Sequence, residues 1–262
     1  MSSKCIDVSQ FNGKISWKDV KASGIDNAYI RVGGRFGKTG AIYKDTRALE
    51  NLKGAIASGL KVGVYFFTQA TTESEAIEEA DWTINFIKDY KITLPVAIDT
   101  EIVEDMSTGG RHNLINRTQR TNVLIAFMNR VKSKGYAPMF YCNTPWLYNK
   151  LEGNRLTSYD FWLAQWTNNI KPNCNRIYSV WQYSEKGKVY GINGNVDLNI
   201  IYKDYGKKET PIYDKYSDDI KLKAMDTLLN KYGTGEERKK KLGSSYAKVQ
   251  ELINYVLKGL SG

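Results

Sequence analysis

The chain has 262 residues, of which 42% are hydrophobic, so it can bury a substantial core and is not composed like a disordered protein. A formal net charge of +10 favours polyanionic partners such as nucleic acid, an anionic membrane or an acidic cell wall. The single histidine excludes a multi-histidine metal site. Three cysteines without a CxxC pair argue against a disulfide framework or a thiolate zinc site.

The first 200 residues alternate between strand-like and helix-like segments. Short runs rich in apolar and aromatic residues predict strands at 4–9, 27–32, 61–68, 94–99, 137–143, 161–166, 178–183 and 195–200. Apolar residues at helical spacing predict helices over 45–60, 72–90 and 117–135, with Asp45 as an N-cap and Gly135 as a C-terminal stop. Strands separated by helices are expected to pair in parallel through right-handed crossovers.

This pattern predicts an α/β fold, an irregular (β/α) barrel with fewer helices than strands, because the later strands have short or absent helices between them. An open doubly wound sheet is the alternative. We assign the barrel to residues 1–204, a linker without periodicity to 205–216 and a small all-α C-terminal module to 217–262. Apolar residues expected inside this module are Leu222, Met225, Leu228, Leu229, Leu242, Val249, Leu252, Ile253, Val256 and Leu257.

Two carboxylates follow the apolar run LPVAID at residues 94–99. Asp99 and Glu101 are two residues apart, so on a strand they point to the same side, about 6.6 Å apart along the backbone. Acids this close raise each other's pKa, so that one can stay protonated as a general acid while the other stays ionised. This arrangement suits cleavage of a glycosidic bond. Capping of the next helix and cation binding are the alternatives.

Two further acids occupy strand positions. Asp7 lies in the first predicted strand and Asp197 in the last, within NVDLN. Because functional groups of a parallel barrel gather where its strands end, all four carboxylates are expected to converge on one cleft. A magnesium site built from these acids remains open, since Mg²⁺ accepts oxygen ligands. The surrounding Trp and Tyr residues favour a carbohydrate groove instead, and we predict no metal or other cofactor.

Several motifs occur in the order typical of one family. They are IDVSQFNGKISWKDVKASGIDNAYIRV, GLKVGVYFFT, PVAIDTE, FWLAQW, VWQYS and NVDLN, spread over residues 5–202. Together they resemble glycoside hydrolase family 25, the muramidases or lysozymes found among phage endolysins and bacterial autolysins. The resemblance implies an irregular (β/α) barrel that cleaves the β-1,4 bond between N-acetylmuramic acid and N-acetylglucosamine in peptidoglycan.

The resemblance also implies roles for individual residues. Glu101 would protonate the leaving oxygen, and Asp99 would be its charged partner, stabilising an intermediate built from the substrate's own acetamido group. The acidic cluster would be completed by Asp7 and Asp197, and the substrate-binding walls would be formed by Tyr65, Tyr141, Trp166 and Gln182. The sequence departs from the family at Arg31, where a lysine is more usual, and we interpret Arg31 as structural.

The C-terminal module resembles, more loosely, the short wall-binding repeat attached to some phage lysozymes. The matching residues are Gly233, Gly235, Arg238, Leu242, Val249, Gln250 and Asn254. The resemblance implies binding to peptidoglycan, and we assign wall contacts to Arg238, Gln250 and Asn254. The turn before the last helix is shorter here than in that repeat, which leaves the ligand open.

Other readings of the chain make different predictions. GGRFGKTG at residues 33–40 resembles a phosphate loop, but its glycine spacing is one residue too short. The basic run RKKK at 238–241 would suit nucleic acid, an anionic wall or plain solvation, and we predict no nucleic-acid partner. A catalytically dead wall-binding barrel is a further alternative. We interpret His112 as a surface loop residue.

The place of action follows from the expected substrate. The sequence lacks an apolar stretch of 18 residues and a signal-peptide pattern, so we predict no membrane insertion. We expect a phage endolysin that is made in the host cytoplasm and acts at the bacterial cell wall, with a bacterial autolysin as the alternative. The sequence predicts no particular oligomeric state.

Overall fold

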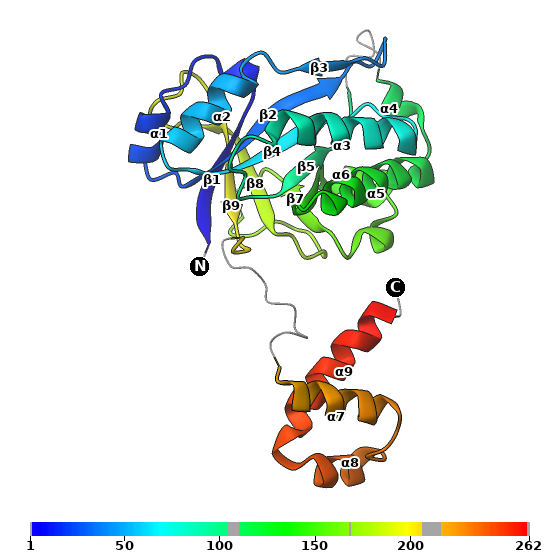
Figure 1. Ribbon diagram of the computed structural model, residues 1–262. Coiled ribbons are helices and arrows are strands. Elements are labelled where there is room, and N and C mark those ends of the chain that lie inside the picture. Colours follow the sequence, from blue (N-terminus) through cyan, green and yellow to red (C-terminus); the bar gives the residue numbers. More distant parts are fainter. Residues whose placement is uncertain (1, 104–109, 168, 206–215, 261–262) are drawn as a thin grey trace. The chain divides into compact units, whose positions relative to one another are not determined.

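The computed structural model describes residues 2–103, 110–167, 169–205 and 216–260 (Figure 1). The chain divides into two compact units, Met1–Tyr205 and Gly206–Gly262. Nearly all of the predicted linker lies outside the described residues, so its conformation stays a prediction.

The first unit is built on a closed sheet. Its strands are β1 (Ser3–Val8), β2 (Asn27–Arg35), β3 (Ile42–Lys44), β4 (Lys61–Phe67), β5 (Val96–Asp99), β6 (Pro138–Asn143), β7 (Asp160–Ala164), β8 (Val180–Gly187) and β9 (Val196–Ile201). They are ordered β1-β9-β8-β7-β6-β5-β4-β2, and pairing of β1 with β2 closes the barrel. The short β3 adds to β2 outside this ring. The predicted barrel is therefore confirmed, and the open sheet is excluded.

The last strand runs against its neighbours, whereas the strands separated by helices pair in parallel as predicted. Pairing is parallel from β1 through β2, β4, β5, β6 and β7 to β8, but β9 is antiparallel to both of its neighbours, β8 and β1. Only residues 188–195 connect β8 to β9. A parallel crossover needs a dozen or more residues, so this short connection forces a return in the opposite direction.

Helices cover the barrel unevenly. They are α1 (Trp17–Ala22), α2 (Ala48–Ala57), α3 (Glu73–Ile87), α4 (Arg111–Leu114), α5 (Arg117–Ser133) and α6 (Thr144–Lys150). In Figure 1, α3 and α5 lie side by side over one flank of the barrel. The described residues between β7 and β9 contain no α-helix, so the helical ring is incomplete, as predicted. Helix α2 begins after Arg47, so Asp45 is not its N-cap, and that prediction was wrong. Asp45 instead pairs with Arg31.

The barrel has a core outside the strands and another inside them. The outer core fills the space between strands and helices. The inner core includes Tyr29, Ala97, Met139 and Trp162, whose rings and chains fill the barrel lumen. Gly63 leaves room for the Tyr29 ring, because a Cβ at residue 63 would lie 2.4 Å from that ring. This packed interior forms a floor beneath the strand ends.

The second unit contains α7 (Asp218–Leu228), α8 (Gly235–Leu242) and α9 (Tyr246–Leu260). Its core consists of Tyr216, Ile220, Ala224, Leu242, Val249, Leu252 and Ile253. The prediction was wrong for Leu222, Met225, Leu228, Leu229 and Leu257, which are exposed. In α7 the inward face is set by Ile220, Ala224 and Thr227, at spacings of four and three residues. The side chain of Val256 lies outside the described set. Among the described residues, no helix combines the length and apolar character that crossing a membrane requires.

Candidate active site

The predicted acids meet at the rim where the parallel strands end. Asp7 lies near the end of β1, and Asp99 is the last residue of β5. Asp197 is near the start of β9, and the antiparallel register places it opposite Asp7. Because β9 runs backwards, its beginning meets the ends of the parallel strands. The direction of β9, which the sequence analysis did not predict, is thus what brings Asp197 to this rim.

Asp7 is held by two amides. Its Oδ2 accepts hydrogen bonds from Gln182 Nε2 at 2.9 Å and from Asn199 Nδ2 at 2.8 Å. The carbonyl oxygens of these amides accept bonds from Tyr141, Trp166 and Trp162, at 3.0, 3.1 and 2.8 Å respectively. Both amides therefore present their NH₂ groups to Asp7, and aromatic residues of the groove fix that orientation.

Asp99 is buried but, in the part of the chain that the structure describes, lacks amide donors like those that hold Asp7. Its side chain is 6% exposed, and among the described residues its Oδ1 has no hydrogen-bond partner. Burial raises the pKa of Asp99 well above its usual range, and the charges of Glu101 and Asp7 raise it further, while Arg31 acts in the opposite direction. A buried carboxyl surrounded by other acids holds a proton at pH values where an exposed aspartate would lose it.

Asp197 shows the same effect. Burial and the neighbouring Asp7 raise the pKa of Asp197 to about 8. Burial also raises the pKa of Asp7, but hydrogen bonds from Asn199, Gln182 and Asp197 counteract it. The two carboxyls therefore share a proton that resides on Asp197 near neutral pH, and Asp7, which accepts hydrogen bonds from two amides, is the anion of the pair.

Glu101 is electrostatically part of the same cluster. It is partly buried and lies just beyond the end of β5. Its charge raises the pKa of Asp99, Tyr141 and Asp197. The structure therefore brings all four predicted acids together. Within the described ranges, no group of three or more His, Cys, Asp or Glu side chains is placed to share a metal ion.

The predicted aromatic walls border this cluster. Tyr65 and Tyr141 both meet the ring of Trp162 edge-on, with ring centroids 5.9 and 5.0 Å apart. Trp166 is 54% exposed, so one face of its indole is available to a ligand. An exposed indole and partly buried phenols beside carboxylates form the kind of surface on which sugar rings stack.

Some residues of the site were missed or misread. Asn199 was missed, although its position two residues after Asp197 places it on the same face of β9. The interpretation of His112 as a surface residue was wrong, since its side chain is 0% exposed. The imidazole is enclosed because it bonds to Ala70 and Thr100, which are distant in sequence. Arg31, which we interpreted as structural, pairs with Asp45 at 2.8 Å.

The predicted wall-binding residues lie on two helices of the second unit. Arg238 in α8 donates from Nε to the carbonyl of Gly233 at 2.9 Å, so part of its guanidinium is occupied. In α9, Gln250 Nε2 donates to Asn254 Oδ1 at 2.9 Å, and both amides are on the surface. Two lysines of the basic run, Lys239 and Lys241, pair with Glu236 and Glu237. Their charge is therefore partly neutralised within α8 itself.

Comparison with known proteins agrees with this geometry. Residues 6–192 match the model of glycosyl hydrolases family 25, and residues 226–257 match the CW_7 repeat. The chain therefore belongs to glycosyl hydrolases family 25 and carries one such repeat, which confirms the resemblance seen in the sequence.

Two curated relatives and one solved structure show how far the likeness extends. The chain is 28% identical to Lysozyme M1 of Streptomyces globisporus over 74% of its length, and 28% identical to the autolytic lysozyme of Clostridium acetobutylicum over 75%. It spans 66% and 55% of those two proteins. It is also similar to the modular autolysin LytC of Streptococcus pneumoniae, solved with a synthetic peptidoglycan ligand. That match has 26% identity and a TM-score of 0.66, covering 77% of this chain and 47% of LytC.

Proposed function

We propose that this chain is an N-acetylmuramidase that cleaves the β-1,4 bond between N-acetylmuramic acid and N-acetylglucosamine in bacterial peptidoglycan. The observation that carries the proposal is the pairing of a buried, poorly hydrogen-bonded Asp99 with Glu101 at the barrel rim. Repulsion makes it costly for both acids to be ionised, so the pair retains one proton. A glycosidase needs such a proton to protonate the departing sugar oxygen.

Within this proposal, each group has one task. Glu101, on the open side of the pair, delivers the proton to the glycosidic oxygen. When the shared proton resides on Glu101, Asp99 is ionised, and its negative charge stabilises the positive charge that develops as the substrate's acetamido oxygen attacks the anomeric carbon. Proton transfer leaves Glu101 as a carboxylate, which takes a proton from the water that opens the resulting ring, with retention of the anomeric configuration. The pair Asp7 and Asp197, which retains one proton near neutral pH, adds one negative charge to the cleft, and the walls are formed by Tyr65, Tyr141, Trp166 and Gln182.

Mass spectrometry of digested cell walls tests the bond that is cut. Purified walls are digested, the fragments are reduced with borohydride, and heat-inactivated protein serves as the control. A muramidase produces new reduced muramic acid ends. Reduced glucosamine ends would indicate a different glycosidase, and free peptides would indicate an amidase. Walls that bind the protein but release no fragments would support a catalytically dead binding barrel.

We also propose that the second unit attaches the enzyme to the wall through Arg238, Gln250 and Asn254. The match to the CW_7 repeat and the surface position of the two amides support this role. Deleting residues 210–262 is expected to leave hydrolysis of a soluble glycan intact while weakening co-sedimentation with walls. In the full chain, the double change Gln250→Ala and Asn254→Ala should weaken sedimentation in the same way. Loss of soluble-glycan cleavage on truncation would refute the two-domain assignment.

The biological role we favour is that of a phage endolysin acting at the host wall, with a bacterial autolysin as the second candidate. Both match the chemistry, and the relatives include autolysins. The chain is expressed in the cytoplasm of a bacterium with susceptible walls, and culture turbidity is followed before and after membrane permeabilisation with chloroform. An endolysin that depends on release should clear the culture only after permeabilisation. Clearing beforehand would favour an autolysin that reaches the wall unaided.

A further inference from the structure

We infer that His112 is a positioning residue of the active site: acting through Thr100, it holds the segment that carries Asp99 and Glu101. This inference rests on the proposed function, because it assigns a supporting role in that same reaction. His112 is the only histidine in the chain and lies on the short helix α4. Its ring is enclosed between the ends of β4 and β5 rather than facing the acids.

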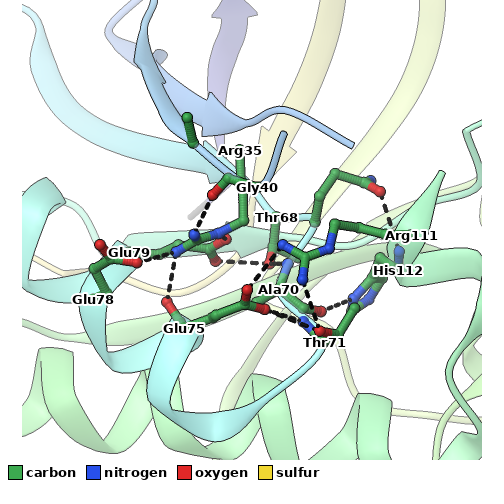
Figure 2. Close-up of polar contacts among 12 residues, drawn as sticks. Arg35, Gly40, Thr68, Ala70, Thr71, Glu75, Glu78, Glu79, Arg111 and His112 are labelled. Atoms are coloured by element: carbon green, nitrogen blue, oxygen red, sulfur yellow. Dashed lines mark hydrogen bonds and ion pairs between the residues drawn. The ribbon is translucent and has the colours of Figure 1, made fainter. Parts of the chain in front are cut away.

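The surroundings of the ring determine its tautomer. Nδ1 of His112 lies 2.7 Å from the carbonyl oxygen of Ala70, which can only accept, so Nδ1 carries the proton (Figure 2). In a neutral ring Nε2 is then an acceptor, and it lies 2.9 Å from Thr100 Oγ1. Thr100 therefore donates its hydroxyl proton to His112. The same hydroxyl oxygen accepts a bond from Trp146 Nε1 at 2.9 Å.

The ring is kept neutral by its environment. Burial lowers the pKa of His112 to about 4, and the positive charge of Arg120 contributes in the same direction. Arg120 also donates to the carbonyl of His112 at 2.8 Å, and the backbone N–H of His112 donates to Gln69. The preceding residue, Arg111, is tied to α3 by an ion pair with Glu75 at 2.8 Å (Figure 2). The imidazole is thus fixed in place as a hydrogen-bond acceptor for Thr100.

Thr100 is placed to transmit this constraint to the acids. It stands between Asp99 and Glu101, and successive residues of an extended chain point to opposite sides. Its buried hydroxyl faces the layer between barrel and helices, so the two carboxylates face the barrel mouth. Strand β5 ends at Asp99, and backbone bonds from Thr68 N to Asp99 O and from Thr100 N to Tyr141 O complete the ladder there. The Thr100 hydroxyl adds a side-chain anchor at the residue between the two acids.

The alternative is a purely structural role, in which His112 and Thr100 only stabilise the fold. The two roles differ in what a mutation changes. Loss of a purely structural bond lowers the melting temperature but leaves kcat unchanged once the protein is folded. Loss of a positioning bond lowers kcat at temperatures far below melting, because a catalytic group displaced by about 1 Å can cost on the order of 10²-fold in rate.

The first test compares three variants on a soluble glycan substrate. Thr100→Val keeps the shape and removes the hydroxyl, whereas Thr100→Ser keeps the hydroxyl. Thr121→Val is the matched control: Thr121 is also buried, and its hydroxyl also donates one bond and accepts one, to Arg117 O and from Glu152 N. Thr100→Val should lower kcat about 10- to 100-fold with KM nearly unchanged. Thr100→Ser should largely restore kcat, and Thr121→Val should lower only the melting temperature. An unchanged kcat in folded Thr100→Val would overturn the inference.

A double-mutant cycle tests whether His112 acts through Thr100. His112→Asn can still bond to Ala70 but is too short to reach Thr100. It should lower kcat as Thr100→Val does, and combining the two changes should produce little further loss. Fully multiplicative losses would show that His112 affects the rate by another route, which contradicts the inference.

Nitrogen-15 NMR of the single histidine provides a readout that needs no activity. Because the chain has one histidine, its imidazole signals require no assignment. The wild-type ring should be neutral and protonated on Nδ1 at both pH 7 and pH 5.5, and Thr100→Val should shift the Nε2 resonance. A ring protonated on Nε2, or an imidazolium at pH 5.5, would refute the hydrogen bond. If wild type cleaves no glycan, the proposed function fails and the positioning role falls with it, while the NMR result still decides the bond.

Discussion

Two buried carboxylates near the same end of the barrel, Asp45 and Asp99, are held in opposite ways. Asp45 accepts hydrogen bonds from the Arg31 guanidinium at 2.8 Å and from the backbone N–H groups of Gln10 and Arg47, each at 2.9 Å. Asp99 has an oxygen with no hydrogen-bond partner among the described residues. The first carboxylate is matched by donors on both oxygens, whereas the second is surrounded by other acids.

This difference separates a structural acid from a reactive one. Ion pairs and backbone donors compensate Asp45 for the loss of water, so its charge holds β2 and the start of α2 together. Asp99 lacks this compensation, so ionising it costs free energy that the rest of the fold must supply. Such unfavourable placement is typical of catalytic sites, where an acid must keep or release a proton at the working pH.

The largest effect is expected for Glu101→Gln, which removes the proton donor from the reactive cluster. An amide has no acidic proton to deliver, so glycan cleavage should fall by about 10²- to 10⁴-fold. The melting curve should remain cooperative, which separates loss of chemistry from loss of fold. Glu73→Gln is a control at an exposed acid of α3 outside the proposed reaction, and it should retain most activity. Retained lysis by Glu101→Gln would remove Glu101 from its assigned role.

Asp45→Asn examines the structural acid. The change leaves the largely buried Arg31 without its anionic partner, which should lower the free energy of unfolding by about 3 kcal/mol. For a unit of this size the melting temperature would drop by roughly 6–12 °C. Thermal melts by circular dichroism measure this. A drop of less than about 2 °C would show that Asp45 is not the structural acid we describe.

Asp99→Asn should have the opposite effect on stability. The pKa of Asp99 is raised in the folded protein, so its contribution to stability is fully present below pH 4 and decreases as the pH rises through the folded value. Replacing the carboxyl by a neutral amide should therefore stabilise the protein at pH 8 while abolishing most activity. The gain should be smaller at pH 5. Lower stability of Asp99→Asn at pH 8 would contradict the inference that ionised, buried Asp99 destabilises the folded protein.

The smallest effect is expected at the surface. Glu78 pairs with the buried Arg35 at 2.7 Å, but the Glu78 side chain is 63% exposed, and Arg35 keeps a second partner in Glu79. Glu78→Gln should therefore change stability by only about 0–1 kcal/mol. Urea denaturation resolves a change of this size when compared with Asp45→Asn. If Glu78→Gln lowered the free energy of unfolding as much as Asp45→Asn does, solvent exposure would not explain which ion pairs stabilise this protein.

Much of the fold could be predicted because it depends on local patterns. The barrel strands, the long helices and the pair Asp99–Glu101 all follow from apolar runs, helical spacing and residues two apart on a strand. The antiparallel direction of β9 was not predicted, although the short connection 188–195 carried the needed signal. Inside the second unit, the choice between Ile220 and Leu222 as inward residue was decided by packing against α9, which helical spacing alone does not specify.

The sequence by itself determined that this chain forms an acid-lined barrel of glycosyl hydrolases family 25 with one CW_7 repeat, because those features are encoded by contiguous motifs. Only the tertiary structure decided which acids are matched by donors and which are not, and that His112 is enclosed, neutral and bonded to Thr100. Those properties depend on desolvation and on hydrogen-bond partners that lie 12, 42 and 192 residues away in the chain. Such partners become neighbours only when the barrel closes.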